Sequence, residues 1–366
     1  MSFIKNLLGK KDNKIKSYDD FWTWFQNNEK SFFKVVKGSG NVERDFFRKL
    51  SPKLDELKDG YFYLTGMLDD NTAELVLTAD GKIKNLIFIE ELVNSAPAIS
   101  GWKFTAHKPA LDIKNVNIDM AGYQFNQGNL SFYPNENSNY PDQIEITVIH
   151  NDLTDDNKDA ITNGVYIFLD NFLGELNFAT VIDYLNVAGK KDKEHELIPI
   201  KKLKEYLIWR EKEFVEKYEG IRHDTENDNY TGFEARLENG NPLIATINTD
   251  LINWDSRTSH PWILKIEIKY GDSSNNGMPN ESTYVLLDEI ENEINSDLKD
   301  FDGYLNIGRQ TADGGREIYL ACRDFRKASK VTHTVLQKYS DKGGLDMDYK
   351  IYKDKYWRTF NRFTRR

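Results

Sequence analysis

The sequence predicts an α+β protein made of two mixed α+β domains. Its 366 residues exceed what one hydrophobic core usually organises, so more than one domain is expected. Apolar residues make up 39% of the chain and aromatic residues 13%, which is enough to build cores although 30% of residues are charged. Helical periodicity alternates along the chain with short runs of branched and aromatic residues bounded by Gly, Asp or Asn, a pattern typical of strands. A wholly disordered chain is thereby excluded.

Residues 1–60 are expected to form an N-terminal helical segment that packs on the first domain. Ser17 lies three residues before Asp20 and just ahead of an aromatic helical face, an arrangement close to a capping box. The dipeptide Ser51-Pro52 predicts a further helix start, with Ser51 as N-cap and Pro52 at the first helical position.

Residues 61–188 are expected to form the N-terminal α+β domain, and residues 189–230 a linker with a connecting helix. The stretch 189–196 is almost entirely polar, residues 203–218 carry apolar side chains on one helical face, and residues 221–231 are again polar and acidic. Within 61–188, helices are expected at 86–96 and 161–172, and strands at 61–64, 74–77, 102–106, 123–125, 130–133, 144–149 and 181–187.

Residues 231–366 are expected to form the C-terminal domain, a ferredoxin-like split β-α-β-β-α-β unit. A leading hairpin is indicated by the turn residues Asn239-Gly240 between 233–237 and 243–248. The element order after it predicts a four-stranded antiparallel sheet with two helices on one face. The elements are a strand at 262–270, a helix at 287–298, strands at 304–310 and 317–322, a helix at 325–339 and a strand at 346–352.

About a quarter of the chain resembles a known bacterial family. The resemblance spans about residues 261–363 and rests on three motifs: the strand Trp262–Tyr270, the tripeptide Gly277-Met278-Pro279 before the helix, and the ending Asp354-Lys355-Tyr356-Trp357. These residues are similar to the domain-of-unknown-function family numbered 695. The resemblance implies no established activity, cofactor or catalytic residue. Some family members stand beside a domain similar to the protein inhibitor of ribonuclease E, which favours a regulatory binding role by analogy.

Charge and composition narrow the classes of partner. With 49 Lys and Arg against 59 Asp and Glu, the net charge of −10 repels a phosphate backbone, so no nucleic-acid partner is expected and basic proteins are favoured. No window approaches 18 consecutive apolar residues, so no membrane partner is expected. Cys322 is the single cysteine, and no Cys/His cluster could cage zinc, so we expect no metal and no cofactor. These features indicate a cytoplasmic protein whose oligomeric state the sequence leaves open.

The two basic ends leave alternatives open. The lysines of residues 5–16 could contact a membrane surface or belong to a solvated terminus. The rings of Tyr356, Phe360 and Phe363 could stack bases, but their spacing favours one helical stripe that packs on the protein.

Few residues carry a chemical signature. Nucleotide-binding loops, metalloprotease helices and nucleophile elbows are absent, and the six histidines stand singly. The acids Asp288, Glu289, Glu291 and Glu293 are expected on a solvated helix face, and Cys322 is expected to be a buried, inert thiol.

Two features remain as candidate ligand or partner contacts. One is the polar loop 271–282, which is either a binding loop or a mobile connector. The other is a pair of arginines around a predicted turn, which could bind a carboxylate or phosphate, or could pair with acids of the sheet itself. The residues are Asp272, Asn276 and Glu281 in the loop, and Arg309, Asp313 and Arg316 at the turn.

The sequence therefore favours a non-enzymatic protein-binding module of regulatory, inhibitor-like or immunity-like type. Its acidic surface would steer a basic partner, and its loops would supply specificity. The alternative is an enzyme that acts on a small or phosphorylated substrate in a cleft between the domains, with Arg309 and Arg316 as ligands. No catalytic residue is expected on the first hypothesis.

Overall fold

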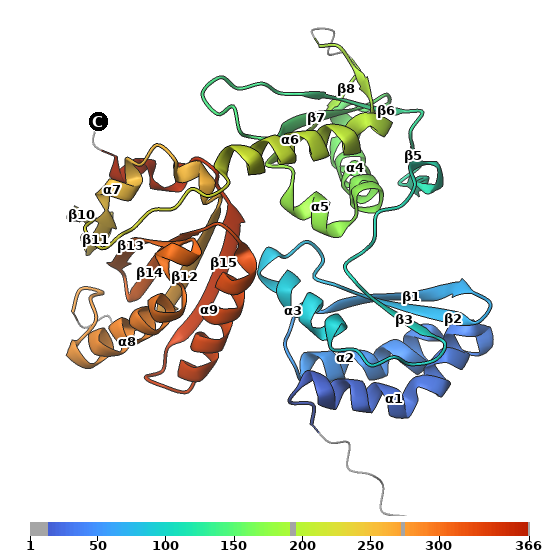
Figure 1. The fold of residues 1–366 in the computed structure, drawn as a ribbon, viewed down its shortest axis with the longest axis horizontal. Coiled ribbons are helices and arrows are strands. Elements are labelled where there is room, and N and C mark those ends of the chain that lie inside the picture. Colours follow the sequence, from blue (N-terminus) through green and yellow to red (C-terminus); the bar gives the residue numbers. More distant parts are fainter. Residues whose placement is uncertain (1–13, 191–194, 272–274, 365–366) are drawn as a thin grey trace, which may run out of the picture. The chain divides into compact units, whose positions relative to one another are not determined.

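The computed structural model describes residues 14–190, 195–271 and 275–364, and the chain divides into two compact units. The N-terminal unit is Met1–Pro109 and the C-terminal unit is Ala110–Arg366. Both combine helices with sheets, so the predicted mixed α+β class is confirmed (Figure 1). No helix within the described residues is long and apolar enough to cross a membrane.

The N-terminal unit places helices against a three-stranded sheet of order β1-β2-β3. Ser17 caps the first helix, accepting the backbone N–H of Asp20, so this predicted helix start is confirmed. Strands β1 and β2 are antiparallel, whereas β2 and β3 are parallel and joined through α3. The elements are α1 (Tyr18–Lys34), α2 (Arg48–Asp55), β1 (Phe62–Asp69), β2 (Thr72–Thr78), α3 (Ile83–Asn94) and β3 (Trp102–Ala106).

The helix start predicted at Ser51-Pro52 is wrong. Both residues lie inside α2, which begins at Arg48. Phe46, Leu50 and Leu54 are fully buried at fourfold spacing, so packing of this face carries the helix through the proline. Pro52 is the fifth residue of α2, and helical backbone from Glu43–Phe47 leads directly into that helix, so the proline removes one intrahelical hydrogen bond that burial of this face offsets.

The first half of the C-terminal unit holds a four-stranded sheet of order β8-β7-β6-β9, named here the middle sheet. Its core combines strand residues such as Phe132 and Val148 with Val165 and Phe168 of α4. The elements are β4 (Ile118–Met120), β5 (Tyr123–Phe125), β6 (Leu130–Pro134), β7 (Glu145–His150), α4 (Lys158–Leu173), α5 (Glu175–Thr180), β8 (Tyr184–Gly189), β9 (Ile198–Pro199) and α6 (Leu203–Tyr218).

These two sheets divide the region that the sequence placed in one domain, 61–188. The division falls after Pro109, because strands β1–β3 and β6–β9 belong to separate sheets. The region expected as a linker, 189–230, also contributes to the core. Its strand β9 pairs with β6, and Leu203 and Leu207 of α6 are buried in the core of the middle sheet.

The second half of the C-terminal unit contains every element predicted for residues 231–352. Its sheet, named here the C-terminal sheet, has the order β10-β11-β13-β14-β12-β15, with antiparallel neighbours throughout. The elements are β10 (Tyr230–Arg236), β11 (Pro242–Asn248), α7 (Thr249–Ile252), β12 (Trp262–Lys269), α8 (Glu281–Asp297), β13 (Tyr304–Ala312), β14 (Gly315–Cys322), α9 (Phe325–Tyr339) and β15 (Asp346–Lys353).

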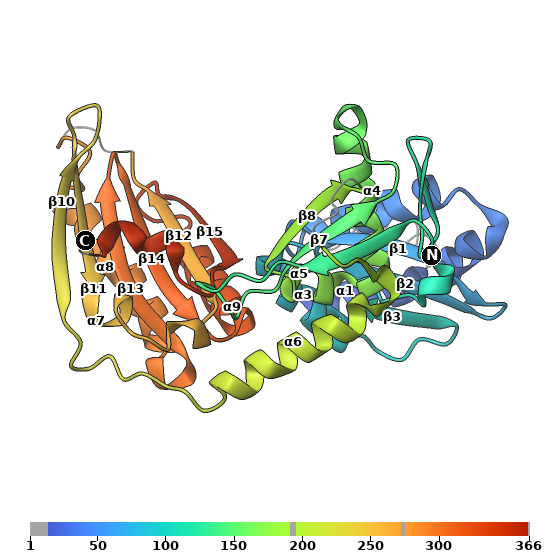
Figure 2. The same ribbon diagram turned by 90° about the horizontal axis from the view of Figure 1, so that it is seen from above.

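The described sheet has six strands rather than four, because the leading hairpin joins it. Strand β11 pairs with β13 from Leu243 with Ala312 to Ile247 with Gly308, which places β10 at the outer edge. Helices α8 and α9 pack side by side over one face (Figures 1 and 2). A second apolar cluster, which includes Ala245, Ile263 and Phe360, fills the other face.

The prediction that the C-terminal aromatic residues form one packed helical stripe is confirmed only in part. Phe360 and Phe363 are buried in the second apolar cluster, as the packing interpretation expects. Tyr356 lies outside that helical turn, which covers Arg358–Phe363, because Trp357 adopts the left-handed conformation with φ 53°. Its hydroxyl group instead donates to Asp142. Of the lysines for which the sequence left a membrane contact or a solvated terminus open, Lys14 and Lys16 are exposed, and Lys5, Lys10 and Lys11 lie outside the described residues.

Candidate functional site

Two turns of the C-terminal sheet meet at Asp313. The turn between β13 and β14 has left-handed backbone at Asp313 (φ 46°) and Gly314 (φ 73°). The Asp313 carboxylate accepts the side-chain amides of Asn239, at 3.0 Å, and Asn241, at 2.6 Å, from the turn between β10 and β11. These two hydrogen bonds hold the pKa of Asp313 below its usual range. The exposed carboxylate thus joins the two turns.

The loop between β12 and α8 packs against the same turn. The carbonyl oxygen of Gly277 accepts the N–H of Gly314, at 2.8 Å, and the hydroxyl of Tyr270, also at 2.8 Å. Asn276 is exposed with φ 52°, and Glu281 is exposed at the first position of α8, which Asn280 caps. We name these three connections the loop end: residues 237–241, 275–281 and 312–315. Asp272 lies outside the described residues.

Replacement of Gly277 by Ala tests the packing of this loop. Gly277 has φ +79°, and a Cβ there would lie 2.8 Å from the Asp313 Cα. We expect Gly277→Ala to lower the free energy of unfolding by about 2–4 kcal/mol, from backbone strain plus overpacking. Gly240→Ala is the matched control, because Gly240 has φ +84° but open space around it. It should cost only about 1 kcal/mol. Equal losses in urea unfolding would refute the close approach.

Arg309 and Arg316 lie on neighbouring strands, as the sequence indicates. Arg316 stands opposite Thr311, so its side chain shares a face with that of Arg309. Both guanidinium groups meet acids of α8. Arg316 Nη1 lies 2.7 Å from Asp288, while Arg309 Nη1 lies 2.8 Å from Glu291 and 3.3 Å from Asp288. Their partners therefore come from the helix above the sheet, and the Arg316 side chain is only 2% exposed.

The expectation of a solvated acidic face on α8 is wrong for two of its four acids. Glu291 is buried and Asp288 is half-buried, because both point at the arginines beneath the helix. Glu289 is exposed, as expected, and Glu293 pairs with Lys338 of α9. Since both arginines already bind carboxylates, this four-residue network stabilises the helix on the sheet.

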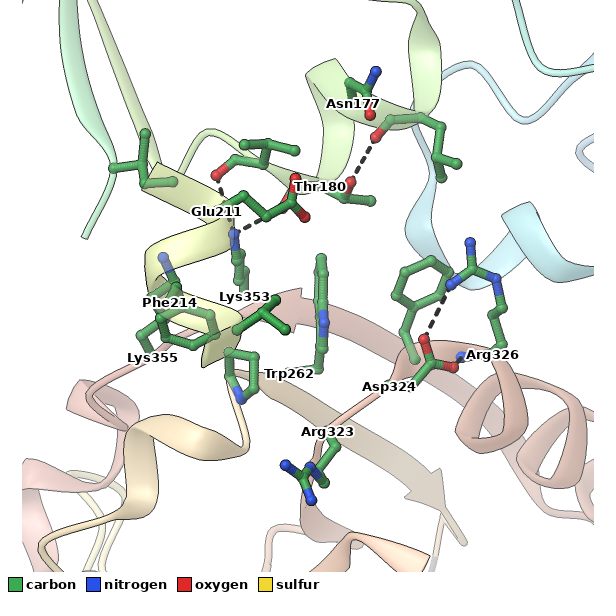
Figure 3. Close-up of a pocket in the computed structure, with 16 residues that line it drawn as sticks. Asn177, Thr180, Glu211, Phe214, Trp262, Arg323, Asp324, Arg326, Lys353 and Lys355 are labelled. Carbon is green, nitrogen blue, oxygen red and sulfur yellow. Dashed lines mark hydrogen bonds and ion pairs between the residues drawn. The ribbon is translucent and has the colours of Figure 1, made fainter. Parts of the chain in front are cut away.

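A separate cavity lies in the same unit, bordered by α5, α6, β12, β15 and the start of α9 (Figure 3). Its volume is about 290 Å³. Apolar and aromatic walls come from Leu176, Val181, Phe214, Val215, Trp262 and Phe325, and charged side chains come from Glu211, Arg323, Asp324, Arg326, Lys353 and Lys355. Sequence reasoning missed this cavity, although the alternation of Lys353 and Lys355 at the end of a strand was visible.

Two lysines beside this cavity converge on Asp183. Lys353 Nζ lies 2.9 Å and Lys355 Nζ lies 2.7 Å from its carboxylate oxygens. Lys353 also donates to the carbonyls of Thr180 and Val181 at the end of α5, where a helix leaves acceptors unsatisfied. Burial, together with the charge of Lys353, lowers the pKa of Lys355 to about 8. This network joins β15 to the middle sheet.

The single cysteine and the metal-ligating side chains provide no metal site among the described residues. Cys322 is fully buried, and burial raises the pKa of its thiol. No group of three or more His, Cys, Asp or Glu side chains that could hold a metal occurs in the part of the chain that the structure describes.

His260 provides a pH-dependent test of the fold. Burial, followed by the charges of Arg222 and His223, lowers the pKa of His260 to about 3. In the unfolded chain this imidazole binds a proton near pH 6.5, whereas in the folded chain it stays neutral at that pH. The free energy of unfolding therefore falls as the pH decreases below 6.5. From pH 7 to pH 5 this residue should remove about 2 kcal/mol, and His260→Gln should remove that share of the decrease. Urea unfolding of both proteins at pH 7 and pH 5 measures this difference. Equal decreases in the free energy of unfolding of the two proteins would refute the role of His260.

Comparison with known proteins gives a match for the C-terminal part of the chain alone. No curated protein and no solved structure matches the chain significantly. Residues 228–364, which comprise the whole C-terminal sheet with its helices, match a family model, so this part of the chain is similar to the family described as "Family of unknown function (DUF695)".

Proposed function

We propose that the chain is a cytoplasmic, non-enzymatic protein-binding module that regulates or neutralises a basic partner through the loop end. The observation that carries this proposal is the convergence of three connections on Asp313. Asn239 and Asn241 hold its carboxylate from one side, and Gly277 packs against its backbone from the other. Loops braced on a rigid sheet present side chains in fixed positions, which specific recognition requires.

The charge of the loop end favours a basic partner. Glu238, Glu281 and Asp313 are all exposed there, and the whole chain carries a net charge of −10. Acidic side chains at a fixed surface steer a positively charged protein towards it and reject acidic competitors. This charge supports the regulatory or inhibitor-like role rather than binding of nucleic acid.

The alternative is an enzyme that acts on a small or phosphorylated substrate. That reading needs Arg309 and Arg316 as substrate ligands, yet both are bonded to Asp288 and Glu291. The pairing disfavours this version of the alternative, since a substrate anion would have to displace the half-buried Asp288 and the buried Glu291 carboxylates.

We also infer that β12-α8-β13-β14-α9-β15 is a ferredoxin-like split βαβ unit. The strand order β13-β14-β12-β15 supports this assignment, because each strand-helix-strand connection passes over one intervening antiparallel strand. The hairpin β10-β11 then extends that unit at its β13 edge.

Affinity capture from the native cytoplasm tests the binding role. The full chain serves as bait, and the test variant is Glu238→Lys with Glu281→Lys, which reverses two exposed charges of the loop end. The matched control is Glu205→Lys with Glu216→Lys, which makes the same charge change at exposed positions of α6.

We expect the loop-end variant to lose the captured protein by at least about ten-fold while its thermal midpoint stays unchanged. The control should retain the captured protein. Equal capture by all three baits, or equal loss in both variants, would contradict binding at the loop end.

A further inference from the structure

The cavity of Figure 3 has the walls of a small-molecule site, and it lies outside the loop end. Trp262 and Phe325 meet edge to face with ring centres 5.0 Å apart, and Leu176, Phe214 and Val215 complete an apolar lining. Its volume of about 290 Å³ is at the small end of the range for ligand sites. An apolar body of one ring fits such a space.

Positive charge around this cavity exceeds the negative charge. Four cations line it: Arg323, Arg326, Lys353 and Lys355. The carboxylates are Glu211 and Asp324 in the lining, and Asp183 behind it, which the two lysines share. Arg323 donates to the main-chain carbonyls of Tyr218 and Ile221, which are neutral acceptors. One bound anion would therefore bring the net charge of these four cations and three carboxylates to zero.

A hydrogen-bond donor in the cavity wall also lacks an acceptor. Trp262 is 7% exposed, and its Nε1–H has no hydrogen-bond partner among the described residues. The buried side-chain atoms without a partner in the described residues do not include this nitrogen, so it remains accessible to solvent, and an acceptor on a bound ligand could reach it. Lys353 Nζ lies 5.7 Å from the centre of the Trp262 ring, so one anionic group could interact with both residues.

We propose that this cavity binds a small organic anion with an apolar, ring-sized body, whose charged oxygens accept the Trp262 Nε1–H beside Lys353. An aromatic carboxylate and an aromatic phosphate monoester share this chemistry. The apolar lining holds the body, and the uncompensated cationic group selects the anion over a neutral analogue. The site is independent of partner binding at the loop end.

Two-dimensional ¹H–¹⁵N NMR of the indole groups of the full chain tests the proposal. The Trp262 resonance is assigned by its absence in Trp262→Phe, which keeps an aromatic wall and removes only the donor. Phenylacetate, phenyl phosphate and neutral phenylacetamide are then titrated separately. Lys353→Gln is the charge variant, and Lys350→Gln is its control, since Lys350 is on the same strand with its side chain 62% exposed.

We expect a saturable shift of the Trp262 resonance with at least one anion, and at least about ten-fold weaker binding of phenylacetamide. The better of the two anions identifies the head group. Lys353→Gln should weaken anion binding, and Lys350→Gln should leave it unchanged. If Lys353→Gln does not fold, calorimetry with Trp262→Phe replaces it, and weaker anion binding is again expected. No saturable shift with either anion, or equal shifts with phenylacetamide, would overturn the proposal.

Discussion

Replacement of Asp288 by Ala is expected to lower the free energy of unfolding by about 3 kcal/mol, although Ala favours a helix. Asp288 lies 2.7 Å from Arg316, whose side chain is 2% exposed. Without it, the nearest carboxylate of Arg316 is Glu291, at 4.0 Å, so a buried cation is left without a bonded anion. Urea unfolding followed by circular dichroism measures the loss.

Glu289→Ala is the control on the same helix, because Glu289 is exposed. It should change stability by less than about 0.5 kcal/mol. Adding Arg316→Met to Asp288→Ala should restore at least about 1 kcal/mol of the free energy of unfolding, because the second substitution removes the unpaired guanidinium charge. Equal effects of Asp288→Ala and Glu289→Ala would show that the network contributes nothing to stability.

Replacement of Asp183 by Ala is expected to cost about 3–5 kcal/mol. Its carboxylate is 6% exposed, accepts both Lys353 and Lys355, and also accepts the N–H of Ile144 at 2.6 Å. The substitution leaves the buried Lys355 ammonium group and the half-buried Lys353 ammonium group close together without the carboxylate that they share. Chemical unfolding monitored by circular dichroism measures the loss.

Asp119→Ala provides the comparison for Asp183, because Asp119 is exposed on β4 of the same unit. Its effect should stay within about 0.5 kcal/mol. If Asp183→Ala proved as mild as this control, the two lysines would have to be solvated, and the arrangement around the cavity would be wrong.

Local sequence signals predicted the elements of the C-terminal domain well. The β10–β11 turn has left-handed backbone at Gly240 with φ 84°, and the β13–β14 turn at Asp313 and Gly314, because these residue types tolerate positive φ. Periodicity placed α6 and α9 within their observed bounds. Such features depend on residues close in the chain, so one sequence contains the necessary information.

Features that depend on distant residues could not be predicted in this way. Alternation along β11 shows which side chains share a face, but it does not show that β13 is the neighbouring strand. The pair of Lys355 with Asp183 joins residues 172 positions apart, and no local pattern announces it. For the same reason the sequence placed Arg309 and Arg316 beside a turn but could not show that acids of α8 neutralise them.

Site-specific photo-crosslinking tests the proposed binding role most directly. A photoreactive amino acid replaces Glu281 at the loop end in one variant and Glu216 on α6 in the other, both exposed positions. After irradiation in the native cells, the account predicts a single defined adduct from position 281 and none from position 216. An adduct formed only from position 216, or none from position 281 in a folded protein, would contradict it.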